Sequence, residues 1–258
     1  MAITVVGVGA VDAATPFVPA VAGPVLADDI ILVLVEQASL TSPEAAITAS
    51  GCAHVTGSPV GPDSAATVLG VLWKRAAGGE TSVTVTGPSN HGVTCTITIR
   101  GVKATGNPWN VTPTVATEAN AQDLIANWPT VTTLADNCLV CLCIATGRDA
   151  NNTANLGAVT GSSLASLAEH MDNWVATGTG GGIGLVTGFK TPAGGIGSPV
   201  ATMGSNDGKA LMTLALEPAA AAFEPPGHLM RSPRPSEQPA TSGPHAESYI
   251  NPHIRPGG

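Results

Sequence analysis

Three of the five cysteines are clustered, and this cluster is the first place where the sequence offers metal-binding chemistry. Cys138, Cys141 and Cys143 lie in "NCLVCLCIATG", and C-x-x-C is half of many zinc sites. The chain has no second C-x-x-C or His pair at zinc-finger spacing. The apolar neighbours indicate a buried strand, on which Cys141 and Cys143 share one face and Cys138 takes the other. We therefore expect small buried thiols, which an odd cysteine count also favours, and no metal.

The best acid–base constellation is in "LAEHMDNW", where Glu169, His170 and Asp172 are close in sequence. A His beside an Asp can bind a metal or transfer protons. If the segment is a strand, Glu169 and Met171 share one face, and His170 and Asp172 share the other. Such pairs are common on solvated surfaces, so we expect this one to be an ordinary surface pair without a functional role.

Two further kinds of chemistry are excluded by local sequence. The opening "MAITVVGVGAVDAATPF" begins like a dinucleotide-binding motif, but Asp12 replaces the third glycine, and Pro16 and Pro19 interrupt the helix that should follow. We expect a strand there and no nicotinamide cofactor. No G-x-S-x-G elbow provides a nucleophile, and a hydrolase such as a depolymerase would need carboxylates clustered in a cleft. The chain is therefore predicted not to be an enzyme, with no catalytic residues and no cofactor.

The composition limits the partners. Of 258 residues, 11% are charged and 3% aromatic, with 31 Gly and 21 Pro, which suits strands joined by turns. The net charge of −8 argues against nucleic-acid binding. No apolar run approaches the roughly 20 residues of a membrane helix, and no secretory signal is visible at the start. We expect neither nucleic acid nor membrane as a partner.

Short apolar or β-branched runs separated by turn signals predict an all-β, antiparallel β-sandwich of jelly-roll-like type. The run 92–102 alternates with period two, with Val93 and Cys95 on one face and Thr94 and Thr96 on the other. Residues 118–129 fit a short helix or an irregular crossing, and 164–175 fit a helix or a hairpin strand. The predicted strands are 3–11, 29–38, 65–76, 81–87, 92–102, 137–146, 181–190 and 209–218.

The composition changes after residue 217. Residues 218–258 hold nine of the 21 prolines without an apolar period, which predicts an extended Pro-rich C-terminal arm after a sandwich domain of residues 1–217. The arm could reach on the order of 120 Å, against a radius of gyration of about 17 Å for the domain. Its apolar residues are the predicted anchors for partner binding: Phe223, Leu229, Met230, Tyr249, Ile250 and Ile254.

Several motifs in 1–218 occur in the order seen in a known module. They are "ADDIILVLVEQ", "SGCAHVTGSPV", "VLWKRAAGGETSVTV", "TITIRGVKATGNPWNV" and "LMTLALEP". Together they resemble the β-sandwich, jelly-roll-like structural module of tailed-bacteriophage virion proteins, which also occurs in bacterial surface proteins. The chain departs from it at Cys52, where similar modules often carry Trp. The resemblance implies a structural role without catalytic residues.

The leading prediction is a non-enzymatic accessory protein on the outer surface of a tailed-phage virion, as head decoration or cement or as a tail-associated protein. Its expected partners are major capsid or tail proteins and copies of itself, and its expected location is the virion, assembled in the host cytoplasm. The alternative is a carbohydrate- or host-receptor-binding module of a tail fibre or bacterial surface protein. Sugar sites use aromatic platforms, and Trp109 in the "NPW" turn is the candidate contact.

Overall fold

The computed structural model describes residues 2–37, 47–61, 67–87, 92–118, 124–147, 155–176, 180–204 and 206–220. These ranges contain fifteen strands, and no helix occurs within them. No described segment is therefore a helix that could cross a membrane. The prediction of an all-β, antiparallel sandwich is confirmed.

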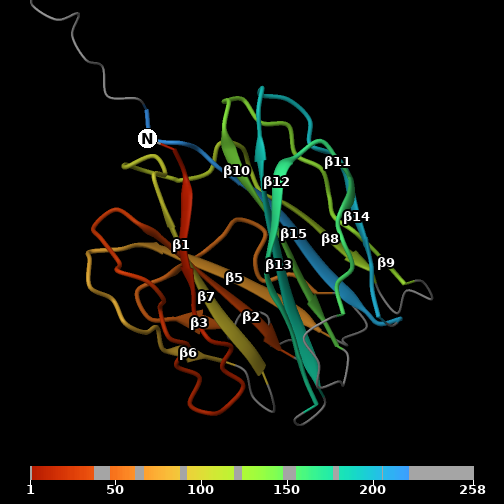
Figure 1. Ribbon diagram of the computed structural model, residues 1–258. Helices are drawn as coiled ribbons and strands as arrows, with labels where there is room; N and C mark the ends of the chain where they lie inside the picture. The colour runs from red at the N-terminus through yellow and green to blue at the C-terminus, as the bar shows by residue number, and fades with distance from the viewer. Residues whose placement is uncertain are drawn as a thin grey trace, which may run out of the picture. The chain divides into compact units, whose positions relative to one another are not determined.

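The first sheet contains five antiparallel strands in the order β1-β7-β2-β5-β4. Its central strand β2 is buried along its whole length, which explains why its sequence is an almost unbroken apolar run. Figure 1 shows this sheet in red to yellow. The strand bounds are β1 Thr4–Val8, β2 Ile30–Gln37, β4 Ala53–His54, β5 Val68–Arg75 and β7 Gly92–Arg100.

The second sheet also contains five antiparallel strands, in the order β12-β13-β10-β15-β8. Its central strand β10 carries the cysteine cluster and is buried throughout. Residues 164–175, whose sequence fits either a helix or a hairpin strand, contain the long edge strand β12. The strand bounds are β8 Thr114–Glu118, β10 Cys138–Thr146, β12 Ala165–Val175, β13 Gly181–Lys190 and β15 Lys209–Leu216.

Two small sheets cover the outer faces of the large ones and give the sandwich four layers. The pair β3-β6 and the segment around Phe17 lie over the first sheet, and the trio β11-β14-β9 lies over the second. Three hydrophobic cores result, one between the large sheets and one beneath each cover. The bounds are β3 Thr48–Ala49, β6 Val85–Thr86, β9 Ile125–Asn127, β11 Thr160–Ser162 and β14 Gly197–Thr202.

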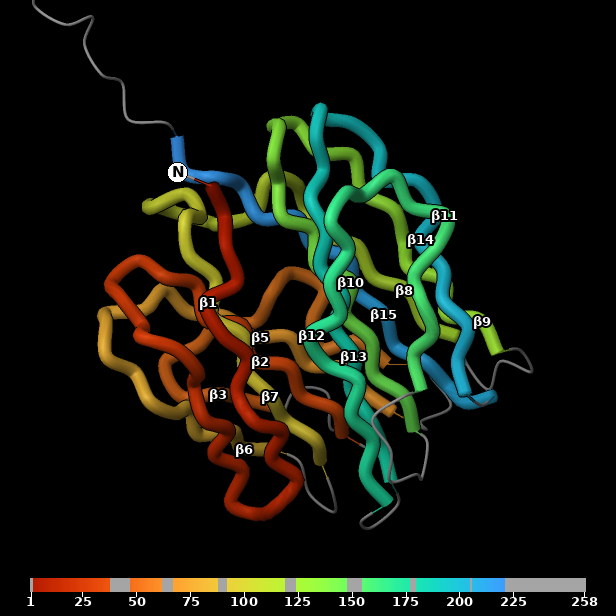
Figure 2. Tube along the Cα trace, in the orientation of Figure 1, coloured from red at the N-terminus to blue at the C-terminus, as the bar shows by residue number. Residues whose placement is uncertain are grey.

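The two halves of the chain repeat the same topology. The order β1-β7-β2-β5-β4 of the first half becomes β8-β15-β10-β13-β12 in the second, and the covering pair β3-β6 becomes β11-β14. Figure 2 shows the red-to-yellow half and the green-to-blue half as separate layers. Each central strand pairs with two neighbours in corresponding places. The matching partners are Ile30 with Arg75 and Ile99, and Leu139 with Phe189 and Leu216.

A backbone detail supports the repeat. Two residues before the matched positions Ile30 and Leu139, the chain adopts left-handed dihedrals, at Asp28 (φ 70°) and Asn137 (φ 59°). Asp and Asn tolerate this region better than most residues. The chain therefore contains an internal structural repeat in which each half forms one large sheet and its cover, and the inner faces of the halves pack on each other. The motifs and periodicity of the sequence did not predict this repeat.

The N-terminal glycines have a structural role. The opening residues form β1, as predicted, and the backbone passes so close to Ala20 that a Cβ on Gly9 would overlap its carbonyl oxygen. The Asp12 carboxylate accepts hydrogen bonds from the backbone N–H groups of Ala14 and Val18, at 3.0 and 2.6 Å. These residues shape the loop that covers the first sheet.

The hydrogen bonding of the sandwich continues slightly beyond residue 217. Pro218 pairs with Val102, and the backbone N–H of Ala219 donates to the carbonyl of Gly101 at 2.8 Å. The chain divides into two units, Met1–Ala221 and Ala222–Gly258. The predicted arm anchors Phe223, Leu229, Met230, Tyr249, Ile250 and Ile254 lie outside the described residues, so their role stays a prediction.

Candidate functional site

The cysteine cluster is divided between two cores, as the alternation of a strand requires. Cys141 and Cys143 face the core between the large sheets, and Cys138 faces the core under β11-β14-β9. Burial raises the pKa of Cys143 to about 12 and that of Cys138 to about 11, so both remain protonated thiols at neutral pH. Among the described residues, no three His, Cys, Asp or Glu side chains are grouped to hold a metal ion.

The acid–base constellation on β12 is not arranged as expected. The pairing of β12 with β13 shifts register between Glu169 and Met171, which marks a β-bulge at His170. Past the bulge Met171 enters the core between the large sheets, and His170 Nε2 lies 2.8 Å from Thr187 Oγ1. Asp172 lies on the outer face of the sheet, the face covered by β11-β14-β9. Glu169 lies on the same face, where it is paired with Val186. The prediction that His170 and Asp172 share a face is therefore wrong, because His170 is the extra residue of the bulge and the alternation of faces restarts after it.

What remains on the outer face is a pair of carboxyl groups. Asp172 is 5% exposed, and its Oδ2 accepts a hydrogen bond from the Leu156 N–H at 3.0 Å. Burial raises the pKa of Asp172, and burial together with the Asp172 charge raises that of Glu169. Glu169 borders a hollow of about 370 Å³ beside Gly157 and Leu167. With His170 turned to the other face, this pair has no imidazole partner for proton transfer within the described ranges.

A second hollow, of about 430 Å³, lies beside Trp109, where the connector between the two halves enters the second sheet. We call it the Trp109 groove. Trp109 is 7% exposed and packs edge-to-face on Trp73, with ring centroids 5.7 Å apart at 71°. It is therefore mostly a core residue and no open stacking platform. The groove is lined by Thr56, Lys103, Gly106, Asn107, Trp109, Asn110, Val111, Thr112 and Pro113.

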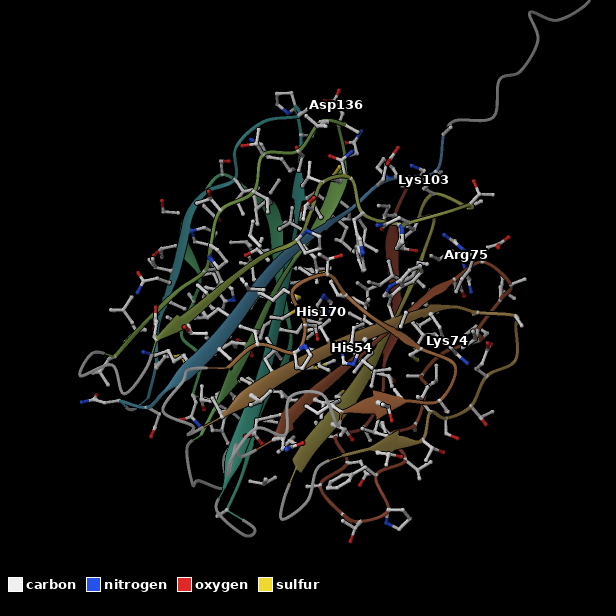
Figure 3. All side chains as sticks on the ribbon, turned by 180° about the vertical axis from the view of Figure 1, so that it is seen from behind. His54, Lys74, Arg75, Lys103, Asp136 and His170 are labelled. Carbon is white, nitrogen blue, oxygen red and sulfur yellow. The ribbon has the colours of Figure 1, made fainter. Side chains whose placement is uncertain are left out.

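Arg75 holds the wall of the Trp109 groove in place. Its guanidinium donates to the backbone carbonyls of Lys103 at 2.9 Å and of Gly106 and Asp28 at 3.3 Å. Lys103 Nζ lies 3.1 Å from Glu217 Oε2, and both side chains are partly exposed. Figure 3 shows Arg75 and Lys103 on the same side of the molecule.

Two asparagines on the groove are oriented by backbone hydrogen bonds. The Oδ1 of Asn107 accepts from the Trp109 N–H at 3.0 Å, and the Oδ1 of Asn110 accepts from the Leu134 N–H at 2.6 Å. These hydrogen bonds orient both amides and leave the NH₂ group of each side chain as a donor. The sequence signal for these residues is the turn-rich connector "KATGNPWN", in which only Trp109 was predicted as a ligand contact.

The other buried tryptophans differ from Trp109 in their hydrogen bonding. Trp128 Nε1 donates to the Cys143 carbonyl at 2.9 Å, and Trp174 Nε1 donates to Thr146 Oγ1 at 2.8 Å. Within the described part of the chain, the Trp109 indole N–H donates to no acceptor, and it is not among the polar atoms sealed from solvent. Trp109 therefore keeps an unused indole donor, and it lines the groove together with Asn107, Asn110 and Lys103.

Fold and sites together define an internally repeated, four-layer antiparallel β-sandwich with a donor-lined groove. A comparison of the chain with protein-family models, curated proteins and solved structures found no match. The resemblance to the virion module therefore rests on the sequence motifs alone.

Proposed function

We propose that this protein is a non-enzymatic structural component that binds neighbouring subunits through its C-terminal arm. In the setting that the resemblance implies, it is an accessory protein on the outer surface of a tailed-phage virion, attached to the head or the tail. Its partners there are capsid or tail proteins and further copies of itself.

The observation that carries this proposal is the anchoring of the chain where it leaves the sandwich. Pro218 pairs with Val102, Ala219 donates to Gly101, and Glu217 forms an ion pair with Lys103. The 38 residues of 221–258 therefore start from a fixed point on the domain. A Pro-rich segment loses little entropy on binding, and a tethered second contact benefits from a high effective concentration.

The charged groups inside the sandwich also support a structural role. Asp29, 2% exposed, receives two hydrogen bonds from Arg100 at 2.9 and 2.7 Å. Lys209 is fully buried and lies 2.9 Å from Glu118. Both pairs join separate strands or loops within the sandwich.

The test is co-sedimentation with phage particles that lack their accessory protein. The full chain is compared with a truncation after Ala220, which keeps the hydrogen bond of Ala219 intact. Saturable binding of the full chain and loss of binding by the truncation support the proposal. Equal binding by both, or by neither, contradicts it, provided that the melting temperature shows the truncation to be folded.

The Trp109 groove favours a second candidate function, recognition of a host-surface carbohydrate. Its amide and indole donors are held in place by backbone hydrogen bonds and by the packing of Trp73 on Trp109. Preorganised polar groups around a concave site are typical of small-ligand binding. A binding assay with soluble saccharides tests this function independently of the arm.

A further inference from the structure

We propose that the Trp109 groove binds a carboxylate-bearing saccharide, such as a uronic acid unit, with Lys103, Asn107, Asn110 and Trp109 as donors. This inference rests on the second candidate function, and it names the chemical class of the ligand. It does not depend on the C-terminal arm.

The first argument is the imbalance between donors and acceptors. The side-chain oxygens of Asn107 and Asn110 each accept from a backbone N–H group, and the NH₂ group of each amide remains as a donor. Lys103 and the Trp109 indole are donors without an acceptor function. The hydroxyl groups of Thr56 and Thr112 are the side-chain acceptors on the lining. A ligand rich in acceptors, and above all a carboxylate, matches this lining.

The second argument is the local charge. The chain carries a net charge of −8, yet Arg75 and Lys103 lie together at this groove. Arg75 is bound by three carbonyl groups and has no carboxylate partner among the described residues. Lys103 is paired with Glu217 at a partly exposed position, and such pairs contribute little stability. The partly exposed Lys103 ammonium is therefore accessible to a ligand carboxylate.

The third argument is the shape and rigidity of the groove. Its volume of about 430 Å³ lies within the range of small-ligand sites. Pro113 and Val111 supply apolar surface on the lining, against which the C–H face of a sugar ring can pack. Because Trp73 fixes Trp109 and Arg75 fixes the connector, the donors need little reorganisation on binding.

The fourth argument compares Trp109 with the equivalent residue in the first half of the repeat. Trp109 pairs with Leu216 as Val5 pairs with Ile99 in the first half, so Val5 is the equivalent residue. Valine has no donor and no aromatic surface. The equivalent position in the first half therefore supplies no indole donor.

The test is isothermal titration calorimetry of the full chain with digalacturonate and with its methyl ester, which lacks only the negative charge. We expect binding of the acid that weakens with salt, and at least tenfold weaker binding of the ester. Asn110→Asp keeps an oxygen for the Leu134 N–H but replaces the NH₂ donor with a carboxylate oxygen. This variant and Lys103→Gln should each weaken binding of the acid at least tenfold.

Lys74→Gln is the matched control, because Lys74 is a neighbouring lysine on the same side of the molecule that pairs with Glu80 at 3.4 Å and does not line the groove. It should leave the affinity unchanged. Equal binding of acid and ester, or normal affinity in both groove variants, overturns the proposal. Absence of acid binding at millimolar concentration, or binding of a polyproline decapeptide in its place, also overturns it. If saccharide binding fails but the full chain still co-sediments with particles through its arm, only the ligand proposal is overturned and the proposed structural function is retained.

Discussion

The indole ring of Trp174 lies against the backbone of Gly182, its cross-strand partner between β12 and β13. A Cβ on Gly182 would come within 2.5 Å of two atoms of the ring. The same indole donates its N–H to Thr146 Oγ1 at 2.8 Å, across to the end of β10. The absence of a side chain at Gly182 therefore allows Trp174 to close one end of the core under β11-β14-β9.

Replacing Gly182 with alanine should destabilise the protein by about 1–3 kcal/mol, the usual cost of overpacking a filled core. The added methyl group must displace Trp174 and break its hydrogen bond to Thr146. Urea unfolding followed by tryptophan fluorescence measures the change. Gly195→Ala is the control, because the nearest atom to its Cβ is 3.9 Å away, at Thr132. Equal stability of the two variants would show that Trp174 has room to move.

Lys209 and Glu118 form a pair in which the lysine is fully buried. Lys209→Met should cost about 3–5 kcal/mol, because it removes the cation from a mostly buried carboxylate, which then keeps, among the described residues, only the hydrogen bonds from Asn127. Adding Glu118→Leu should recover most of this loss, since a buried pair and an apolar pair of similar volume are often equally stable. Chemical unfolding of both variants checks the prediction, and a double variant no more stable than the single one contradicts it.

Asp172 makes a pH-dependent contribution to stability. Its folded-state pKa is raised by burial above the ordinary value of 3.8, so between these two pKa values the folded chain binds the proton more strongly than the unfolded chain. The free energy of unfolding therefore falls as pH rises through this window. The Asp172→Asn variant has no titratable group at this position, so it lacks this pH-dependent contribution. The stability of the wild type relative to the variant should decline from about pH 4 upward, and a constant difference in pH-dependent urea melts excludes the effect.

The thiols should differ in reactivity. Cys52 is the one cysteine that is not fully buried, and burial still raises its pKa to about 11. We expect an aromatic disulfide reagent to label one thiol slowly in the folded protein, with a rate that increases with pH, and all five after unfolding. Cys52→Ala should abolish labelling of the folded state. Rapid labelling of that variant would show that β10 or β7 opens.

The sequence predicts the long strands well because burial and alternation leave a local signal. In β7, the side chains of Val93 and Cys95 enter the core between the large sheets, as their alternation with Thr94 predicts. The threonine face is buried as well, because loops cover it: Thr96 Oγ1 donates to the Ala20 carbonyl. A polar face on a strand therefore does not by itself indicate contact with solvent.

Two features could not be predicted in this way. The bulge at His170 changes the faces of the residues after it, and it depends on how β12 pairs with β13, which the sequence of β12 alone does not contain. The internal repeat preserves the direction of side chains more than their identity. Leu32 and Cys141 occupy matching places, and they share little except burial in the same core.

The internal repeat also means that an interface between two similar halves is enclosed in one polypeptide. Two separate subunits would dissociate on dilution, whereas covalently joined halves meet at an effective concentration that dilution does not change. Joined halves also need not remain alike. One copy can acquire a residue such as Trp109 while the other keeps Val5, a freedom that a symmetric homodimer, with every substitution present twice, does not have.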